Sequence, residues 1–516
     1  MNGEKRLIAV LEIGSTGIRL LVAEIVTGGN SGGEWRILDR AGKSVALGRD
    51  VFTSGQVSRE SFLECIAVFQ GFREQLGGWG IADEDIHVIA TSALRAARNR
   101  DVFVDRLRQE TGFQVTIVEG IEENRLMYLA VRFALKNDLP QLWRANSMII
   151  DVGGGSTEIM LLRRGKMVAA HSLKLGTILI DQQTRQAMGS AQSLIRYLNE
   201  KVRNTSEFLS SELDLAYIRT FVVAGSDARM VASQIGNELN ENCRIIDRDA
   251  FFQFIRTVEG YSIEECVQKL HIPFVDAEGF VPGMLVYRLF LERTMAAQVV
   301  VPNVSLREGF LIDLIQGVDP ELRDDFFSQI IASAVNLGRK YHYDEAHSRH
   351  VADLCLTLFD DLLQKHGMNR RERMLLEVAA LLHDIGMFIR GSGHNRHGQY
   401  IVVNSEIFGL RQEELDIIAN VVRYHRGDPP VETDIDYIAL QREERVLVLK
   451  LSALLRVADA LDRGHSQHIK GITVERKTET LVLHVEGNYD LSLEHIGLEE
   501  KAVLFQDVFG YKVIVT

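Results

Sequence analysis

Short apolar runs that end in glycine-rich or hydroxyl-rich turns recur through the first three hundred residues of the chain. The runs that predict strands are residues 7–11, 20–24, 85–90, 114–118 and 147–150. Runs of that length, bounded by glycine, serine or asparagine, are typical of strands rather than helices. The runs at 85–90 and 114–118 each lead into a predicted helix, so this part of the chain predicts an α/β fold.

Helical periodicity dominates from a natural break at Gly317-Val-Asp-Pro320 to about residue 468. Three predicted helices there carry polar residues that bear on function: one opens at Glu345, one covers 375–386 and one covers 448–462. The tail changes character again. Its predicted strands lie at 472–476, 480–486 and 510–516, with a helix at 501–505. We therefore expect an all-α domain followed by a small α+β cap.

Composition limits the class of protein. The 516 residues, 46% hydrophobic and 25% charged, accommodate three or four globular domains. The predicted boundaries are 1–128, 129–316, 317–470 and 471–516. No apolar stretch approaches the length of a membrane span, and a predicted strand stands where a secretory signal would have its apolar region. The four cysteines have no CxxC spacing, which favours reduced thiols of a cytoplasmic protein. The net charge of −13 argues against a general nucleic-acid binder, so we expect neither nucleic acid nor membrane as a partner.

The segment Asp151-Val-Gly-Gly-Gly-Ser-Thr-Glu158 is the most informative in the chain. Apolar runs flank it, so it predicts strand, tight turn and strand. Three glycines have no Cβ and allow positive φ, so that their N–H groups can converge on an anion. The preceding acid suits a divalent cation, and the following hydroxyls suit phosphate oxygens. The segment predicts a phosphate–Mg²⁺ site, with a glycine-rich hairpin that binds no ligand as the alternative.

A weaker copy of this pattern lies near the N-terminus, at Glu12-Ile-Gly-Ser-Thr-Gly-Ile-Arg19. It too lies between two predicted strands. An acid, glycine and small hydroxyl residues therefore occur twice, roughly 140 residues apart. This duplication suggests two similar lobes that hold one phosphorylated ligand between them.

Two strand-to-helix junctions carry further candidate residues. Thr91-Ser-Ala-Leu-Arg95 places hydroxyls and an arginine at a helix start, where backbone N–H groups favour anions. Glu122 and Glu123 open the following helix. Acids in a first turn favour the helix dipole without any further role. The functional hypothesis is that one of them orients or deprotonates a water that attacks a phosphoryl group.

These motifs, with Ser305-Leu-Arg-Glu-Gly309, resemble in their order the exopolyphosphatase / guanosine pentaphosphate phosphohydrolase (Ppx/GppA) family over roughly residues 5–315. The resemblance implies two ribonuclease-H-like lobes of the actin/hexokinase-like ATPase superfamily, and Mg²⁺-dependent removal of terminal phosphate from polyphosphate or pppGpp. It implies that Glu123 activates water and that Arg95 binds phosphate. The predicted phosphate-binding residues are Gly14, Ser15, Thr16, Arg19, Gly153, Gly154, Gly155, Ser156 and Thr157. The predicted metal ligands of the lobes are Asp151, Glu158 and Glu12.

The chain departs from the family pattern in two places. The first loop of the family usually reads Asp-x-Gly-Ser-Asn-Ser, and here Glu12, Thr16 and Gly17 stand at the Asp, the Asn and the final Ser. Asp227 adds an acid where a Gly-Gly-Thr-like turn is common. Because small displacements of a metal or water are costly to catalysis, these departures favour retained phosphate binding over full turnover.

The helical part carries a second set of candidate ligands. His347, the pair His383-Asp384 and Asp459 lie on three predicted helices and resemble the metal set of the HD phosphohydrolase superfamily. Imidazole and carboxylate ligands together suit Mn²⁺, Fe²⁺, Zn²⁺ or Mg²⁺. His394 and His397 lie in the loop 391–398, and His425 ends another predicted helix. Histidines at such places resemble those that complete a second metal site in this superfamily, and His397 and His425 are the candidates for it. His350 lies one turn from His347, and only one of these two needs to face the metal.

Three functions remain open at this point. The leading one is a phosphoanhydride hydrolase that acts in the cleft between the two lobes, with polyphosphate or guanosine penta- or tetraphosphate as ligand and a homodimer as assembly. The second places turnover in the HD-type centre, while the lobes bind a polyphosphorylated regulator. The third is a non-catalytic sensor or dimerisation protein.

Overall fold

The computed structural model describes residues 4–27, 34–135, 144–187, 191–315, 320–362, 367–485 and 490–516. The chain forms two compact units, Met1–Phe326 and Phe327–Thr516. The break predicted at residues 317–320 lies almost entirely outside the described residues. Within the described ranges, no helix is both long and apolar enough to cross a membrane.

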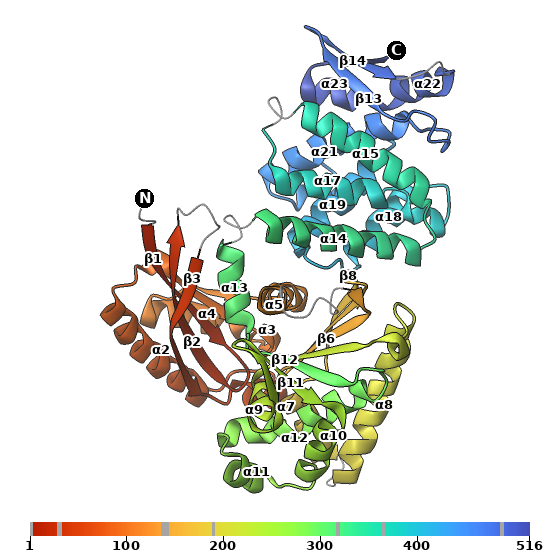
Figure 1. The fold of residues 1–516 in the computed structure, drawn as a ribbon. Coiled ribbons are helices and arrows are strands. Elements are labelled where there is room, and N and C mark those ends of the chain that lie inside the picture. Colours follow the sequence, from red (N-terminus) through yellow and green to blue (C-terminus); the bar gives the residue numbers. More distant parts are fainter. Residues whose placement is uncertain are drawn as a thin grey trace. The chain divides into compact units, whose positions relative to one another are not determined.

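Two mixed sheets form the framework of the first unit (Figure 1). The strands of the first sheet are β1 (Glu4–Ile13), β2 (Gly17–Thr27), β3 (Glu34–Ser44), β4 (Ile86–Ala90) and β5 (Val115–Ile117). The strands of the second are β6 (Ser147–Val152), β7 (Thr157–Arg163), β8 (Lys166–Leu173), β9 (Thr220–Ala224), β10 (Asn237–Asn240), β11 (Cys243–Asp247) and β12 (Gln298–Pro302). All strands predicted from the apolar runs are present, with small shifts of their ends.

The two sheets share one topology. The first has the order β3-β2-β1-β4-β5, and the second contains β8-β7-β6-β9-β12 with β11 and β10 added at its edge. In each, the first three strands in sequence are antiparallel neighbours, and the last two run parallel to the central strand. This repeat agrees with the two similar lobes predicted from the glycine turns.

Helices cover the sheets of the first unit. They are α1 (Leu47–Ser54), α2 (Arg59–Trp79), α3 (Ser92–Ala96), α4 (Arg100–Thr111), α5 (Gly120–Leu135), α7 (Thr177–Ala187), α8 (Ala191–Ser210), α9 (Ser226–Ile235), α10 (Arg248–Val258), α11 (Ile263–Leu270), α12 (Phe274–Leu291) and α13 (Leu306–Ile315), with 3₁₀ turns at Asp83–Asp85 and Leu215–Tyr217. Helices α5 and α13 pack side by side. Helix α5 runs through the predicted lobe boundary at 128/129, and that boundary stays a prediction.

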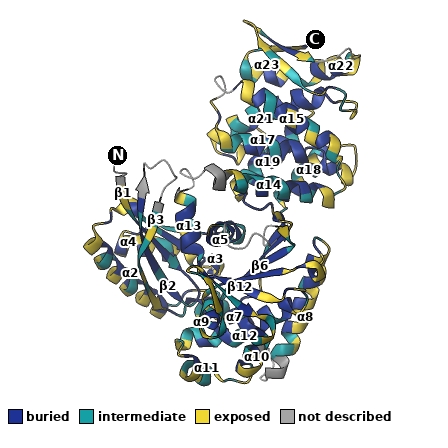
Figure 2. Cartoon of the chain, in the orientation of Figure 1, coloured by how far each residue is buried: buried dark blue, intermediate teal, exposed yellow. Residues whose placement is uncertain are grey.

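The apolar run in β1 shows why this sheet is covered on both faces. Successive side chains of a strand point to opposite faces. Ala9 and Leu11 join one buried cluster with Phe69 of α2. Ile8 and Val10 join another, with Leu311 of α13. Figure 2 shows that buried residues lie along the strands β6 and β12, whereas exposed residues lie on the outer faces of the helices α2 and α8.

The second unit is a helical bundle with a small sheet. Its helices are α14 (Pro320–Lys340), which begins before the unit boundary, α15 (Glu345–Asp361), α17 (Arg370–Leu382), α18 (His394–Val403), α19 (Gln412–Tyr424), α20 (Ile435–Ile438), α21 (Arg442–Ala460), α22 (Ser492–Lys501) and α23 (Val503–Phe509), with a 3₁₀ turn at Ile385–Phe388. Its strands are β13 (Ile472–Arg476), β14 (Thr480–Val485) and β15 (Lys512–Val515). Helix α21 packs against α15 and α19 inside the bundle.

The tail has more helix than its sequence pattern predicted. β14 is the central strand, antiparallel to β13 and parallel to β15. The helix predicted at 501–505 is present with shifted bounds, as α23 at Val503–Phe509, and α22, which ends at Lys501, was not predicted. Both helices pack on α21 and β15, so burial against neighbours adds order that a short polar segment does not reveal by itself.

Candidate functional site

The ends of six strands meet at one pocket in the first unit. The turns after β1 and β6 and the segments after β4, β5, β9 and β12 all contribute, because the carboxyl ends of parallel strands lie at one edge of a sheet. The pocket has a volume of about 130 Å³. The polar and glycine residues that line it are Glu12, Gly14, Ser15, Thr16, Arg19, Thr91, Ser92, Glu123, Asp151, Gly153, Gly154, Ser156, Glu158, Thr177, Gly225, Ser226, Asp227, Arg229, Asp276, Gly279, Ser305 and Arg307. Residues predicted from separate motifs therefore face one space.

The segment 151–158 forms the predicted strand, turn and strand. Its glycines are needed for a different physical reason than the one expected from the sequence. Asp151 pairs with Glu158 across β6 and β7. None of the three glycines in this described turn has a positive φ, so that expectation is wrong. Instead, a Cβ on Gly154 would lie 2.6 Å from Cβ of Ser15, and one on Gly155 would lie 2.3 Å from Cζ of Phe52. The glycines allow the second loop to lie against the first lobe.

Gly155 and Thr157 do not line the pocket. The Thr157 hydroxyl donates to the carbonyl oxygen of Leu175 at 2.7 Å. Neighbouring residues of a strand point to opposite faces, so Thr157 turns away from the face that carries Ser156 and Glu158. These two residues lie outside the pocket lining, and their contact with phosphate stays a prediction.

Glu123 and Arg95 form a partly buried ion pair at the pocket. The Arg95 guanidinium donates to the Glu123 carboxylate, and also to the carbonyl oxygen of Val118 at 2.5 Å. Burial raises the pKa of Glu123 to about 7, against the opposing effect of Arg95. Glu123 lines the pocket and Arg95 does not. Arg95 is therefore placed to hold Glu123 rather than to contact a ligand directly.

The remaining carboxylates of the pocket suit a hard cation. Burial raises the pKa of Asp151 to about 6, the pKa of Asp227 to about 7, and the pKa of Glu158 well above its usual value. A divalent cation beside these carboxylates would favour their charged forms. An all-oxygen donor set is what Mg²⁺ prefers, and Mg²⁺ commonly uses only one or two protein carboxylates besides water and substrate phosphates. The residues present therefore fit Mg²⁺.

Two departures from the family pattern have a local explanation. Oε2 of Glu12 lies 3.3 Å from Nε of Arg307, so the longer acid has a cationic partner. A Cβ on Gly17 would lie 2.5 Å from the carbonyl oxygen of Lys43, which is on the neighbouring strand β3. The close approach of β3 therefore requires glycine at this position, where the family usually has serine.

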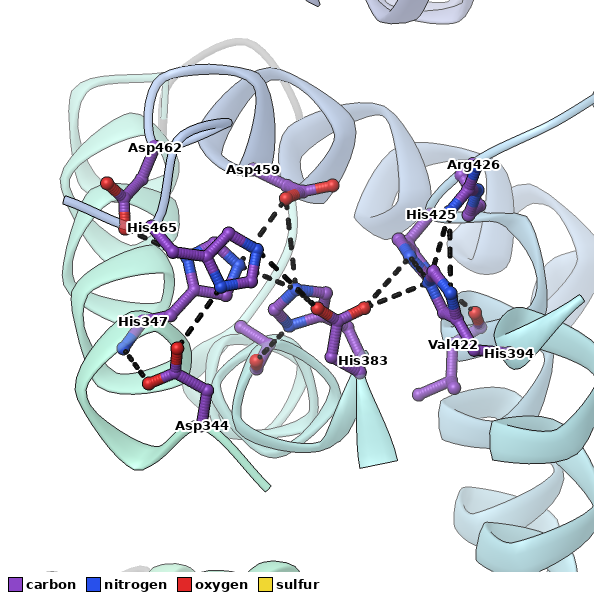
Figure 3. Close-up of polar contacts among 12 residues, drawn as sticks. Asp344, His347, His383, His394, Val422, His425, Arg426, Asp459, Asp462 and His465 are labelled. Atoms are coloured by element: carbon purple, nitrogen blue, oxygen red, sulfur yellow. Dashed lines mark hydrogen bonds and ion pairs between the residues drawn. The ribbon is translucent and has the colours of Figure 1, made fainter. Parts of the chain in front are cut away.

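A second cluster lies inside the helical bundle (Figure 3). Its members form three groups in which one ligand atom from each residue lies within 4.8 Å of the others. The groups are His347, His383 and Asp459; His347, Asp384 and His465; and Asp384, His394 and His425. They are the potential metal sites of this kind found among the described residues of the chain. His347 and Asp384 each belong to two groups, so the three groups form one continuous centre.

The histidines of this centre face one another. Nε2 of His347 lies 3.2 Å from Nε2 of His383 and 3.6 Å from Oδ1 of Asp459. On the other side of His347, Nδ1 lies 2.8 Å from a carboxylate oxygen of Asp462. A carboxylate behind a ligating imidazole fixes its orientation and raises its basicity. Burial lowers the pKa of His347, but Asp459 and Asp462 raise it more, to about 9.

The second half of the centre is built in the same way. Nε2 of His394 lies 3.0 Å from Oδ1 of Asp384 and 3.3 Å from Nε2 of His425. Burial, together with the charge of His383, lowers the pKa of His425 to about 3. Burying several imidazoles and carboxylates is costly unless they share protons or a cation. The mixed nitrogen and oxygen donors fit Mn²⁺, Fe²⁺ or Zn²⁺.

Comparison with known proteins assigns the family. The Ppx/GppA phosphatase family matches residues 21–317, and its domain III, described as "Ppx/GppA phosphatase, domain III", matches residues 331–507. The chain belongs to the Ppx/GppA phosphatase family. This membership confirms the resemblance predicted from the motifs, and with it the prediction of an enzyme of the exopolyphosphatase / guanosine pentaphosphate phosphohydrolase type.

Sequence relatives of this Ppx/GppA family member match most or all of its length. It is 24% identical to a guanosine-5'-triphosphate,3'-diphosphate pyrophosphatase of Pseudoalteromonas translucida, over 100% of this chain and 99% of that one. It is 22% identical to a protein of the same name from Aeromonas salmonicida, over 92% of each chain. The crystal structure of an exopolyphosphatase from Cytophaga hutchinsonii superposes with a TM-score of 0.53 and 18% identity, over 61% of this chain and 99% of that one. This last likeness shows that the matched part of the chain shares the fold of that exopolyphosphatase.

In this Ppx/GppA family member, most of the predicted ligands in the helical part come together. His347, His383, Asp384, Asp459 and His425 all belong to the centre. His397 belongs to none of the groups, and His394, one turn earlier on α18, occupies the place predicted for it. His350 also lies outside the groups. Their roles as metal ligands stay predictions, as does the HD-type nature of the domain.

Sequence reasoning missed two residues of this centre. His465 stacks on His347, with ring centroids 3.6 Å apart, although it lies in the loop after α21. Asp462 follows Asp459 on the same predicted helix, but the sequence does not indicate its contact with His347, which is 115 residues away. A loop residue belongs to no helical periodicity. The one sequence signal for His465 is its position three residues after Asp462.

Proposed function

We propose that this protein hydrolyses phosphoanhydrides, releasing terminal orthophosphate from inorganic polyphosphate or pppGpp at the pocket of the first unit, with Mg²⁺ as cofactor. The observation that carries the proposal is Glu123, a partly buried carboxylate that faces the same small pocket as both glycine turns. The printed names of the relatives, a guanosine-5'-triphosphate,3'-diphosphate pyrophosphatase and an exopolyphosphatase, support this choice of substrates.

The size and charge of the pocket support recognition of a phosphate group. A volume of about 130 Å³ is far below the range of roughly 300–1,000 Å³ that holds drug-sized ligands. A terminal phosphate group fits this space. Arg19 and Arg307 would neutralise phosphate oxygens, and the hydroxyls of Ser15 and Ser156 would donate to them.

The reaction then depends mainly on position and charge. Glu123 would accept a proton from the attacking water, and Arg95 would hold its carboxylate in place. Asp151, Glu158 and Glu12 would hold the Mg²⁺ or its water ligands. Mg²⁺ held by these carboxylates would supply positive charge near the phosphate oxygens and so stabilise the charge that develops on the leaving group.

Orthophosphate release from polyphosphate and from pppGpp, measured with Mg²⁺, tests the proposal. Glu123→Gln keeps the shape of the side chain but removes the base, and we expect release from both substrates to fall by roughly 100-fold or more. Glu110→Gln, an exposed residue of α4, is the matched control and should leave the rate unchanged. The proposal is wrong if wild-type protein releases no orthophosphate from either substrate, or if Glu123→Gln is as fast as wild type.

A second candidate function rests on the centre in the helical bundle. Its buried histidines and aspartates support a metal-dependent phosphohydrolase, with the first unit binding a polyphosphorylated regulator. Tightly bound transition metal that is lost in Asp384→Ala would support this candidate, and metal-free protein of normal fold would oppose it.

Binding of pppGpp without any turnover would instead select a non-catalytic sensor. The proposal includes a homodimer, which the molar mass in solution tests.

A further inference from the structure

A cavity of about 480 Å³ lies over the histidine–aspartate centre of the second unit. Asp384, His394, His425 and Asp459, which belong to the centre, are among its walls. Its volume is within the range that holds small organic ligands, unlike the pocket of the first unit. The centre is therefore accessible to a ligand of about the size of a mononucleotide.

Four cationic side chains line this cavity, and three of them come from three different segments and bear on ligand binding. Arg426 follows α19, Arg463 follows α21, and Lys501 ends α22. The Lys501 ammonium donates to Oδ2 of Asp459. A guanidinium nitrogen of Arg426 lies 3.4 Å from Nδ1 of His394. Two of the three cations thus lie directly beside members of the histidine–aspartate centre.

The third cation has a partner that an anion can replace. Arg463 donates to Glu500 at 2.7 Å, and both side chains are more than one-third exposed. Exposed ion pairs contribute little stability, so a phosphate dianion competes well for the guanidinium. A fourth cation of the cavity, Arg456, donates to the carbonyl oxygens of Tyr424 and Gly427 and has a structural role.

We infer that Arg426, Arg463 and Lys501 form a phosphate clamp, which binds the terminal phosphate of a phosphomonoester about the size of a nucleotide above the histidine–aspartate centre. The inference rests on the second candidate function, since the clamp names the substrate class of that centre. A phosphomonoester carries two negative charges at neutral pH and offers three terminal oxygens to three cations. A phosphodiester carries one charge and two such oxygens, so it fits the clamp less well.

The clamp gives the C-terminal segment a part in the site. The carbonyl oxygen of Lys501 accepts a hydrogen bond from Nε of Arg456 at 3.0 Å, which fixes the end of α22 at the cavity. Lys501 is then directed toward Asp459, and Glu500 toward Arg463. Helix α22 therefore contributes ligand-binding side chains in addition to covering α21.

Binding of inorganic phosphate to the full-length protein tests the clamp, with dimethyl phosphate as the monoanionic comparison. Calorimetry gives the Kd, and elemental analysis gives the metal content of each variant. We expect Lys501→Met and Arg463→Gln each to weaken phosphate binding by roughly tenfold, with metal content unchanged. Lys501→Arg should keep most of the affinity. Lys477→Met, which removes an exposed lysine paired with Glu475 outside the cavity, is the matched control. Phosphate also fits the pocket of the first unit. The quantity that tests the clamp is therefore the difference in Kd between wild type and each variant, not the Kd of the wild type alone.

Each other outcome has a separate meaning. Equal phosphate affinity in wild type, Lys501→Met and Arg463→Gln overturns the clamp while leaving the metal centre intact. Loss of metal together with phosphate affinity also overturns it, because the cations would then act only by supporting Asp459 and its neighbours. Metal-free wild-type protein whose phosphate affinity still falls in both variants would instead refute the second candidate function and keep the clamp.

Discussion

Removing the charge of Arg95 should shift the pH dependence of phosphate release to higher pH. Burial raises the pKa of Glu123 to about 7, and Arg95 opposes that rise. Glu123 must be ionised to accept a proton from water, so the rate increases with pH through its pKa. Arg95→Met keeps the length of the side chain and removes the stabilising charge, so the pKa of Glu123 rises further.

The contact sets the size of the shift. Two unit charges about 4 Å apart interact by about 4 kcal/mol at an effective dielectric constant of 20, and a hydrogen bond to a charged group is worth about 1.5–3 kcal/mol net. Since 1.36 kcal/mol corresponds to one pKa unit, the net value predicts a shift of roughly 1–2 units. At pH 7 the ionised fraction of Glu123, and with it kcat/KM, should fall roughly 5- to 50-fold, and it should recover near pH 9.

The assay is orthophosphate release with Mg²⁺ between pH 5.5 and 9.5, at substrate concentrations well below KM. Arg98→Met, an exposed arginine three residues further along, is the matched control and should keep the wild-type profile. A loss of rate in Arg95→Met that is equal at every pH would refute this reasoning. That result would mean that Arg95 contacts the phosphate itself, as the family resemblance implied.

Three further variants test other parts of the structure. Gly155→Ala places a Cβ 2.3 Å from Phe52 and should cost about 1–3 kcal/mol of unfolding free energy in urea, whereas Gly260→Ala, with open space around it, should be close to neutral. A larger loss in Gly260→Ala than in Gly155→Ala would contradict the packing argument. Asp384→Ala removes a carboxylate shared by two ligand groups and should reduce the bound transition metal by at least half, by elemental analysis; unchanged content would exclude it as a ligand. Arg125→Met removes the buried partner of two acids and should cost about 3–5 kcal/mol, and a cost below 1 kcal/mol would show that the network is dispensable.

The sequence by itself determined the local parts of this protein. A turn between two strands, or a helix that starts after a strand, depends on residues within about ten positions, and its signals are glycine, hydroxyls and apolar periodicity. The turn at 151–158 and the helix that begins before Glu123 were therefore predictable. The order of these local motifs was also sufficient to indicate the family.

Tertiary structure decided which of these parts meet. Arg95 reaches Glu123 across 28 residues of sequence, and His347 reaches Asp462 across 115. It also selected His394 over His397, although both lie on one helix, and it turned Thr157 away from the pocket. Contacts of this kind depend on how helices and strands pack, and packing is set by buried surfaces distributed along the whole chain. A local pattern specifies which residues are available, whereas side-chain direction and distance arise only when distant segments are brought together.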